Sequence, residues 1–420
     1  MRRERIAITG VGLTCPNGNN LVEFRKNLLE GKSGVTIFKE KLMGEVLAGL
    51  CNYDENKYQT KKERRRGTRA ASIGIYCAHE ALSDANINLM DIDKSKIGIY
   101  VGITEHGIVE STKEILSIKE YDYNVKYISH LLNPNAIANN PAGEISLNLG
   151  ITGPHYTLGA ACAAGNIGLI NGAQMLMLGD VDIAICGGVS ESTETFLIFG
   201  SFKNEGALAN HKYPEKACRP FDVDRNGIVI SEGGCLFILE RLGDALTRNA
   251  KIYGEVVGYG INTDATDYVA PNSERQAQCM VMALNKAEIH PQDINIINTH
   301  ATSTLLGDET EGKAIYKIFE NHKNVYITNT KSYIGHTMGA AGALELAGEL
   351  PSFEDGFVHQ ILNLDNLDTK CMVTNVVRNE PIRLDNIKYI LNNSFGMLGI
   401  NSAVIIKNMN KTCTNGGNVK

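Results

Sequence analysis

A strand–helix–strand pattern in the middle of the chain constrains the fold more than any other feature of the sequence. His155–Gly159 is typical of a short strand, Ala163–Leu178 of a small-residue helix that Gly179 closes, and Asp182–Gly187 of a buried strand. This β-α-β order is typical of α/β proteins, in which helices cover a sheet.

The second half of the chain repeats this alternation. We predict helices at 275–286, 310–319 and 340–350, and strands at 252–260, 294–298, 325–328, 389–392 and 403–407. Two halves with the same order of elements predict a pseudo-duplicated α/β protein, although the residues themselves show no clear repeat. Because 420 residues exceed one ordinary domain, we expect an N-terminal half at 1–250, a C-terminal half at 251–410 and a tail at 411–420.

The first half contains further elements outside this central pattern. Residues 5–10 and 96–102 are predicted strands, and residues 21–30 and 70–84 are predicted helices. The following stretch, 103–150, is polar and rich in asparagine, which favours an irregular lid or an excursion toward an interface.

Composition and charge exclude several classes of protein. Hydrophobic residues make up 43% of the chain and charged residues 21%, as in a globular enzyme. The net charge of −6 gives no general attraction to nucleic acid or to an anionic membrane, so we expect neither as a partner. The basic N-terminus lacks the apolar core of a signal peptide, and no run of about 18 apolar residues follows. We therefore expect a cytoplasmic protein without a spanning helix.

The ten cysteines are scattered singly, without a CxxC pair. We expect most of them to be small buried residues, not disulfides or zinc ligands. The chain also lacks a phosphate-binding glycine–lysine loop and a HExxH motif, so no motif supports a nucleotide or metal site.

Cys162 is the candidate nucleophile. It follows the predicted strand and begins the helix of small residues. Backbone N–H groups and the positive dipole end at a helix N-terminus stabilise a thiolate and can lower the thiol pKa. The same groups can hold the oxyanion that forms when a thiolate attacks a thioester. A buried cysteine among alanines is the structural alternative, but the strand–turn–helix context favours a nucleophile.

Two histidines occupy comparable positions in the second half. His300 follows a predicted strand and stands beside hydroxyl residues, a position that also suits a structural histidine; His336 lies in a glycine loop before a helix of small residues. Lys331 precedes His336, and Glu345 follows it. A lysine and a glutamate can fix the tautomer and charge of a nearby histidine, although each could also form a solvated ion pair.

One thiol, two imidazoles and a lysine, each at the end of a strand or the start of a helix, indicate chemistry at a thioester. The thiolate would take an acyl group. The two imidazoles could stabilise the enolate that forms when a malonyl unit loses carbon dioxide. This chemistry needs no metal.

On these residues the chain resembles the elongating β-ketoacyl-acyl-carrier-protein synthases, the type II fatty-acid and polyketide ketosynthases of the thiolase fold. The resemblance covers about residues 4–408 and is most specific around Cys162 and in the segments 300–308, 331–336 and 393–396. It implies a thiolase-like α/β fold, with two pseudo-duplicated mixed-sheet halves in an α-β-α-β-α arrangement of layers. It also implies an acyltransferase that joins malonyl-carrier protein to a cysteine-bound acyl chain by decarboxylative Claisen condensation.

The resemblance implies a role for each candidate catalytic residue. Cys162 would accept the acyl group, and His300 and His336 would promote decarboxylation and stabilise the enolate. Lys331 and Glu345 would support the two histidines.

The resemblance also implies the residues that contact the substrate. Thr302 and Thr304 match the hydroxyls that contact the phosphopantetheine arm, and Phe395, Met397 and Leu398 belong to the gate of the acyl pocket. The N–H groups of residues 162 and 397 match the oxyanion hole.

Partners and cofactors follow from the same resemblance. Lys62, Arg65 and Arg66 fall where the family places cations that receive an acidic carrier protein, although a solvated basic face is the alternative. We expect acyl carrier protein as a partner. It brings its own phosphopantetheine, so we expect no other cofactor. We also expect a homodimer, or a heterodimer with a related ketosynthase-like subunit.

Two departures from the family pattern bear on the substrate. The family commonly has glycine where this chain has Ala301, and Gly-Phe-Gly-Gly where this chain has Gly396-Met-Leu-Gly399. Methionine and leucine make the gate loop bulkier and its backbone less free. The departures favour a specialised polyketide or polyene synthase, with a housekeeping fatty-acid elongation enzyme as the alternative.

Three other interpretations fit the sequence less well. A coenzyme A thiolase would use a second cysteine in place of His336. An initiating synthase of the same fold would carry an asparagine there. A partner subunit that only shapes the acyl tunnel would lack Cys162.

Overall fold

The computed structural model of the chain describes residues 4–409, and its largest sheet has ten strands. Their order is β11-β10-β14-β15-β9-β1-β8-β6-β4-β5. The bounds of these strands are β1 Ile6–Thr14, β4 Ile97–Ile103, β5 His155–Gly159, β6 Ile183–Ser190, β8 Gly233–Arg241, β9 Gly254–Thr263, β10 Ile296–Asn298, β11 Tyr326–Thr328, β14 Tyr389–Gly396 and β15 Ile400–Lys407.

The large sheet consists of two five-stranded halves with one topology. In each half the first strand pairs antiparallel with the fifth, and the fifth pairs antiparallel with the fourth. The fourth strand then pairs parallel with the second, and the second with the third. The halves join where β1 pairs antiparallel with β9 over Ile6–Ile8. This repeat of order and direction confirms the predicted pseudo-duplication.

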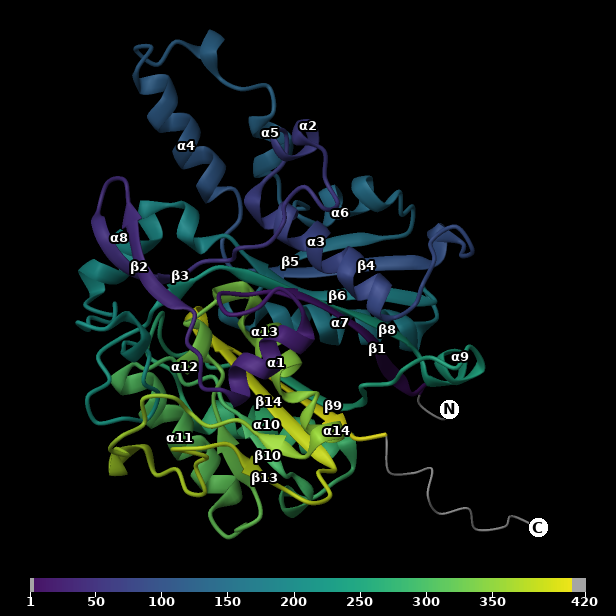
Figure 1. Cartoon of the computed structure of the whole chain (residues 1–420), viewed down its shortest axis with the longest axis vertical. Coiled ribbons are helices and arrows are strands. Elements are labelled where there is room, and N and C mark those ends of the chain that lie inside the picture. The colour runs from purple at the N-terminus through teal and green to yellow at the C-terminus, as the bar shows by residue number, and fades with distance from the viewer. Residues whose placement is uncertain (1–3, 410–420) are drawn as a thin grey trace.

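Two helices, α7 (Ala164–Leu178) and α13 (Ala341–Glu349), pack between the two halves of the sheet. Helix α3 (Arg69–Asp84) covers the outer face of the first half, and α10 (Ser273–Ala287) covers that of the second, with α11 (Leu305–Phe319) beside it (Figure 1). The predicted α-β-α-β-α order of layers is therefore confirmed.

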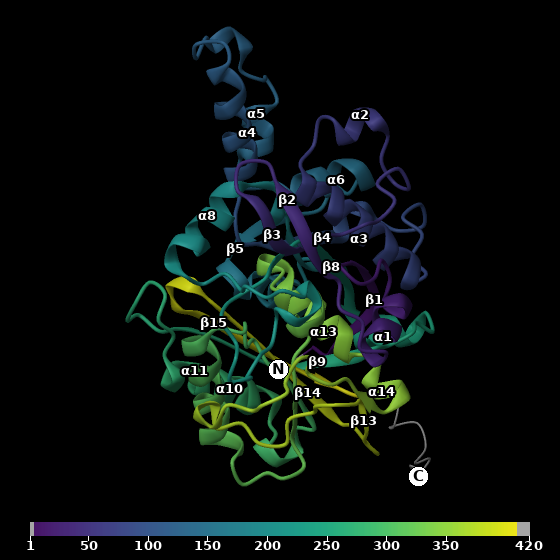
Figure 2. The same cartoon turned by 60° about the vertical axis from the view of Figure 1, so that its left-hand side comes forward.

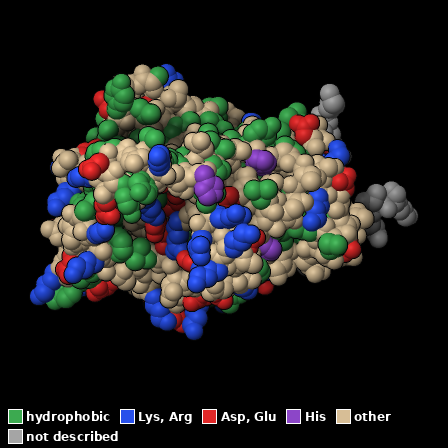
Figure 3. All heavy atoms as spheres, turned by 90° about the horizontal axis from the view of Figure 1, so that it is seen from above, with side chains coloured by type: hydrophobic (Ala, Val, Ile, Leu, Met, Phe, Trp, Pro, Cys, Tyr) green, Lys and Arg blue, Asp and Glu red, His purple; other side chains and the backbone are tan. Residues whose placement is uncertain are grey.

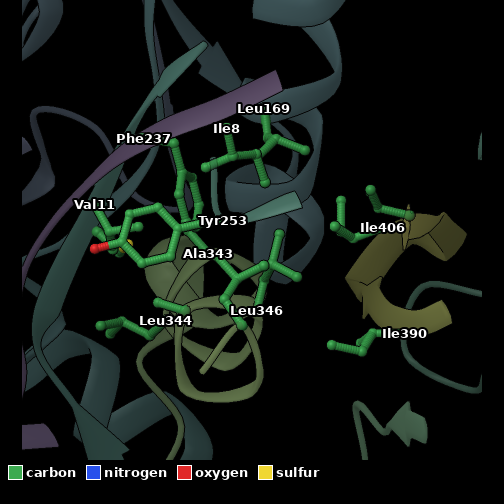
Figure 4. Close-up of a cluster of buried hydrophobic side chains, with 14 of the residues drawn as sticks. Ile8, Val11, Leu169, Phe237, Tyr253, Ala343, Leu344, Leu346, Ile390 and Ile406 are labelled. Atoms are coloured by element: carbon green, nitrogen blue, oxygen red, sulfur yellow. The ribbon is translucent and has the colours of Figure 1, made fainter. Parts of the chain in front are cut away.

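The two central helices share one hydrophobic core with both halves of the sheet. Figure 4 shows Ile8 and Phe237 of the first half, Ile390 and Ile406 of the second, and Leu346 of α13 in this cluster. Burying one such side chain stabilises the fold by about 1.5–3 kcal/mol. This shared core fixes the strand ends of the two halves relative to one another.

Helix α7 approaches the sheet closely because of its glycines. A Cβ atom on Gly168 would lie 2.1 Å from the carbonyl oxygen of Gly187 on β6. Within residues 4–409 the stretch Ala161–Leu178 alone is long and apolar enough to span a membrane, yet 61% of it is buried inside the fold. The buried core helix of a globular protein has the same composition.

Residues 103–150 differ from the irregular segment that we predicted. They contain α4 (Ile108–Lys119), α5 (Leu132–Ala136) and α6 (Ala142–Leu149). Helix α4 projects from the body of the molecule (Figures 1 and 2), in agreement with an excursion. Helix α6 forms because it buries Ala142, Ile145 and Leu149, which recur at helical spacing among polar residues.

Further elements were missed in the sequence. We did not predict strand β8 from the sequence. Nor did we predict β2 (Val35–Glu40), β3 (Gly44–Gly49) and β7 (Ile230–Ser231), which form a small second sheet. Strand β8 is an almost continuous buried apolar run, which periodicity alone does not identify as a strand. The nine cysteines of the described residues are buried and free, as expected. Cys413 and the predicted tail 411–420 lie outside the described residues.

Candidate active site

Cys162 lies in a tight turn between β5 and α7. The turn spans Ala161–Ala163, and Ala161 has a φ of 45°, in the left-handed region that side chains disfavour. A strained strand–turn–helix junction of this kind is typical of an exposed nucleophile. Here Cys162 is 7% exposed, at the wall of a cavity.

His336 contacts Cys162 directly. Its Nε2 atom lies 3.1 Å from the Sγ atom of Cys162. The backbone N–H of Met338 lies 3.3 Å from Nδ1 of the same ring and donates to it. Because a backbone N–H can only donate, Nδ1 carries no proton, and the proton of the neutral ring is on Nε2. His336 therefore presents an N–H group toward the sulfur and toward any thioester oxygen beside it.

His300 completes the group. Its ring centroid lies 5.4 Å from that of His336, at an interplanar angle of 80°, and 6.0 Å from that of Phe395. The sulfur of Cys162 and a nitrogen of each histidine all lie within 4.8 Å of one another. The structure thus brings together three residues that the sequence keeps far apart.

Lys331 and Glu345 form a fully buried ion pair next to the two histidines. Burial lowers the pKa of both His300 and His336 well below its ordinary value, and the charge of Lys331 lowers each pKa further. Both imidazoles are therefore neutral at physiological pH. As neutral rings they can donate hydrogen bonds without adding a charge to the buried site.

The pKa of the Cys162 thiol differs from our expectation. Burial raises its pKa to about 12, and the nearby charge of Lys331 offsets only part of this effect. A helix N-terminus was expected to lower the pKa, but loss of water around the thiolate is the larger effect here. The resting nucleophile is therefore a thiol.

A cavity of about 460 Å³ reaches the three residues. Its walls also include the predicted substrate-binding residues Thr302, Thr304, Phe395 and Met397. Leu398, by contrast, is not on this wall: it is 67% exposed, and its N–H donates to the carbonyl oxygen of Tyr268 at 2.8 Å.

Glu311 is a buried residue of the site that the sequence interpretation missed. Its carboxyl group accepts the backbone N–H groups of His300, at 2.9 Å, and of Ala301, at 2.6 Å, and the side-chain amide of Asn393 at 3.1 Å. Burial raises its pKa to about 7. Through these three hydrogen bonds Glu311 fixes the loop that carries His300. A signal was present, because Glu311 lies at the start of the predicted helix 310–319, directly after the segment 300–308 that carries His300.

The thiol and the two imidazoles could also offer three ligands to a metal ion. They are the only such group within residues 4–409. The buried ammonium group of Lys331 opposes a divalent cation at this point, for the same electrostatic reason that it opposes protonation of both histidines.

The predicted carrier-binding cations lie on α2 (Lys61–Arg64) and directly after it. Lys62, Arg65 and Arg66 are exposed, whereas Arg69 is engaged by Glu232 at 2.7 Å. Helix α2 lies near the upper end of the molecule in Figure 1, and Figure 3 looks onto that end. Lys and Arg side chains are visible on this face.

Known proteins match this chain along most of its length. Two family models match it: Beta-ketoacyl synthase, N-terminal domain, over residues 3–245, and Beta-ketoacyl synthase, C-terminal domain, over residues 253–365. A curated relative, the 3-oxoacyl-[acyl-carrier-protein] synthase 2 of Staphylococcus aureus (strain N315), is 33% identical over 413 residues. The alignment covers 97% of this chain and 99% of the relative.

Two solved structures are similar over nearly the whole chain. The ishigamide ketosynthase/chain length factor has a TM-score of 0.87 and 29% identity, covering 96% of this chain and 99% of that one. AntDE, a type II polyketide ketosynthase solved in complex with its acyl-carrier protein and bound to the hexaketide, has a TM-score of 0.88 and 26% identity, covering 97% and 100%. With the site described above, these matches show that the chain belongs to the β-ketoacyl synthase family of condensing acyltransferases.

Proposed function

We propose that this ketosynthase condenses malonyl-carrier protein with an acyl chain held on Cys162, by decarboxylative Claisen chemistry. The observation that carries the proposal is the 3.1 Å contact between Nε2 of His336 and the sulfur of Cys162, with the ring of His300 beside it. A nucleophile and two neutral imidazoles around one point can serve both acyl transfer and enolate stabilisation.

In the first half-reaction the sulfur of Cys162 attacks the thioester of an acyl-carrier protein. The carrier's sulfur leaves and takes up the proton that the Cys162 thiol gives up. The N–H groups of Cys162 and Met397 would hold the oxyanion. A Cβ atom on Gly396 would lie 3.0 Å from the nitrogen of Cys162, so the loop that carries Met397 packs directly against the nucleophile.

In the second half-reaction malonyl-carrier protein enters and loses carbon dioxide. His300 and His336 then donate hydrogen bonds to the enolate oxygen, and the enolate carbon attacks the carbonyl carbon of the acyl group on Cys162. The bond from that carbon to the sulfur breaks, and the Cys162 thiolate that leaves takes up a proton from solvent. The ion pair of Lys331 with Glu345 supports this step. Burial and the charge of Lys331 keep both rings neutral, so they stabilise the enolate without protonating it.

The cavity walls support a carrier-bound substrate. We propose that Thr302 and Thr304 contact the phosphopantetheine arm, which arrives on the carrier protein as the only prosthetic group that the reaction needs. Phe395 and Met397 would shape the acyl pocket, with Leu398 at its mouth.

Two pathways remain as candidates. The bulky gate loop and the similarity to the ishigamide and AntDE ketosynthases favour specialised polyketide or polyene synthesis. The Staphylococcus aureus relative favours fatty-acid elongation as the second candidate. For either pathway we propose a cytoplasmic enzyme.

We propose that acyl carrier protein docks on Lys62, Arg65 and Arg66, because its acidic surface would complement these exposed cations. The AntDE ketosynthase was solved in complex with its carrier protein, which supports a partner of this class.

We also propose a dimer with an identical or a related subunit. Strand β5 ends the large sheet and leaves one edge open. The nearby projection formed by α4 and the residues after it exposes apolar side chains: Ile115, Leu116, Tyr121, Tyr123, Val125 and Tyr127. Within the subunit we place the division between the halves at 250/251, between β8 and β9.

The test is self-acylation of Cys162, measured by intact mass with a mixture of acyl-carrier proteins of differing length and unsaturation. The wild type should gain one acyl mass, which also identifies the preferred chain and so separates the two pathways. Cys162→Ala should gain none. Cys186→Ala, which changes another buried cysteine, is the control and should acylate normally. Acylation of Cys162→Ala at the wild-type rate would refute the proposal.

A further inference from the structure

A second buried carboxyl–imidazole pair lies close to the proposed catalytic residues. Glu349 follows Glu345 by one turn of α13, and its Oε1 atom lies 3.1 Å from Nδ1 of His359. Both side chains are fully buried. Burying two such groups is costly unless they are paired and hydrogen-bonded, and the proposed reaction uses neither of them.

Two further side chains close a ring with this pair. Nε2 of His359 lies 3.2 Å from the hydroxyl oxygen of Thr330. The side-chain amide of Asn298 donates to that hydroxyl oxygen at 2.8 Å and to Oε1 of Glu349 at 3.3 Å. Asn298, Thr330, His359 and Glu349 therefore contact one another in a closed circuit, which we call the buried ring.

Three members of the buried ring lie beside a proposed catalytic residue in the chain. Asn298 ends β10, two residues before His300, and its amide also donates to the backbone oxygen of Glu345 at 3.2 Å. Thr330 directly precedes Lys331. The buried ring thus joins the three separate segments that carry His300, Lys331 and Glu345.

The fourth member anchors the buried ring to the sheet. The backbone oxygen of His359 accepts the hydroxyl of Thr328, at the end of β11, at 2.7 Å. The ring of Tyr333 lies edge-on to His359, with centroids 5.4 Å apart. His359 therefore has a fixed position from which its two nitrogens reach Thr330 and Glu349.

The protonation state of the pair follows from its surroundings. Burial raises the pKa of Glu349 to about 8 and lowers the pKa of His359. The nearby cation, Arg25, donates to the backbone oxygen of Gly348 at 3.1 Å and pairs with Asp355. Burial therefore favours the uncharged form of both groups, so that neither brings a net charge into the buried ring.

We propose that Asn298, Thr330, Glu349 and His359 are positioning residues that hold the His300 loop and the Lys331–Glu345 pair in the arrangement that decarboxylation requires. The inference rests on the proposed function, which gives His300 and Lys331 their role in the second half-reaction. Breaking the buried ring should therefore slow condensation and leave acyl transfer to Cys162 largely intact. A displacement of about 1 Å at reacting groups can cost about 10²-fold in rate.

The test uses Thr330→Val and Glu349→Leu, with both half-reactions measured by intact mass and by product formation. Each variant should lower the turnover of condensation by about 10- to 100-fold, with little change in the rate of self-acylation or in KM. Thr330→Val keeps the shape of the side chain, so it carries the test if Glu349→Leu does not fold.

Glu349→Gln is the conservative variant. Its amide oxygen can take the place of Oε1 and accept from Asn298, and the side chain keeps its length and polarity, so condensation should fall much less than in Glu349→Leu. Glu240→Leu is the matched control. It removes another buried carboxyl group, that of Glu240 on β8, which forms an ion pair with Arg248 at 2.6 Å. It should leave the ratio of the condensation rate to the self-acylation rate unchanged.

Equal loss of both half-reactions in Thr330→Val, or no loss in either, would overturn the positioning role. So would a Glu349→Gln variant as slow in condensation as Glu349→Leu. Failure of the wild-type enzyme to acylate Cys162 would instead overturn the proposed function, so the two failures are distinguishable.

Discussion

At the scale of single residues, the chemistry depends on where the protons lie. The Met338 N–H places the proton of His336 on the nitrogen that faces Cys162. Burial and Lys331 keep both histidines neutral, while burial keeps Cys162 a thiol until substrate arrives. Acyl transfer and decarboxylation therefore use different side chains around one point.

This division predicts a split between the two half-reactions. His300→Ala or His336→Ala should lower condensation by about 10²- to 10³-fold, because each removes one donor to the enolate oxygen. Self-acylation should fall much less. Intact mass reports acylation, and product formation reports condensation. His130→Ala, at an exposed histidine, should change neither rate, and equal loss of both half-reactions would contradict the assigned roles.

At the scale of elements, the nucleophile depends on how closely α7 packs on the sheet. Gly168 faces the backbone of β6, and a methyl group there would collide with the carbonyl oxygen of Gly187. Gly168→Ala should therefore lower the free energy of unfolding by about 1–3 kcal/mol and displace the turn that carries Cys162.

Urea unfolding measures this effect. Gly200→Ala, on α8 (Phe196–Glu205), is the matched control, because nothing lies within 4 Å of its new methyl group. It should stabilise the protein by up to about 1 kcal/mol through helix propensity. A Gly168→Ala variant as stable as the wild type would contradict the close packing of α7 on β6.

Helix α2 gives a second prediction at this scale. Reversing charge with Lys62→Glu, Arg65→Glu and Arg66→Glu should raise KM for carrier-bound substrates at least about tenfold at low salt, with little change in kcat. A substrate carried on free pantetheine should be unaffected. Lys323→Glu with Lys370→Glu and Lys388→Glu, three reversals at exposed positions elsewhere, is the control for net charge. An unchanged KM would place carrier docking on another surface.

At the scale of the whole molecule, buried titratable groups give stability an unusual dependence on pH. Burial raises the pKa of Glu105 to about 7 and that of Glu349 to about 8, above the value of 4.5 for an unperturbed carboxyl. The stability that such a carboxyl contributes is complete below about pH 4.5 and is lost as pH rises through the folded-state pKa. His300 and His336 act oppositely, because their lowered pKa destabilises the fold below about pH 6.5.

Stability should therefore fall between about pH 6.5 and pH 8, by up to about 1.4 kcal/mol per pH unit for each such carboxyl. Chemical unfolding at several pH values measures this slope. Glu105→Gln and Glu349→Gln remove two of these titrations and should lessen the slope, while Glu311, whose pKa burial also raises to about 7, keeps part of it. A slope unchanged in the double variant would assign the effect to other groups.

Much of this protein could be predicted from its sequence. The β-α-β pattern around Cys162 and its repetition predicted the duplicated α/β fold, because hydrophobic periodicity and glycine positions are local properties. The two histidines and Lys331 were recognisable because each stands where a strand or loop gives way to a helix. Strand β8 and helix α6 were not, because one is a uniform apolar run and the other is hidden among asparagines.

Only the tertiary structure determined how these residues work. The contact of His336 with Cys162, the neutral histidines, the raised thiol pKa and the buried ring of Asn298, Thr330, Glu349 and His359 all depend on residues distant in the chain. Desolvation and hydrogen bonding act through space, so no spacing in the sequence reports them. The sequence by itself determined which groups could react and in which fold; packing of the two halves around α7 and α13 determined their protonation and geometry.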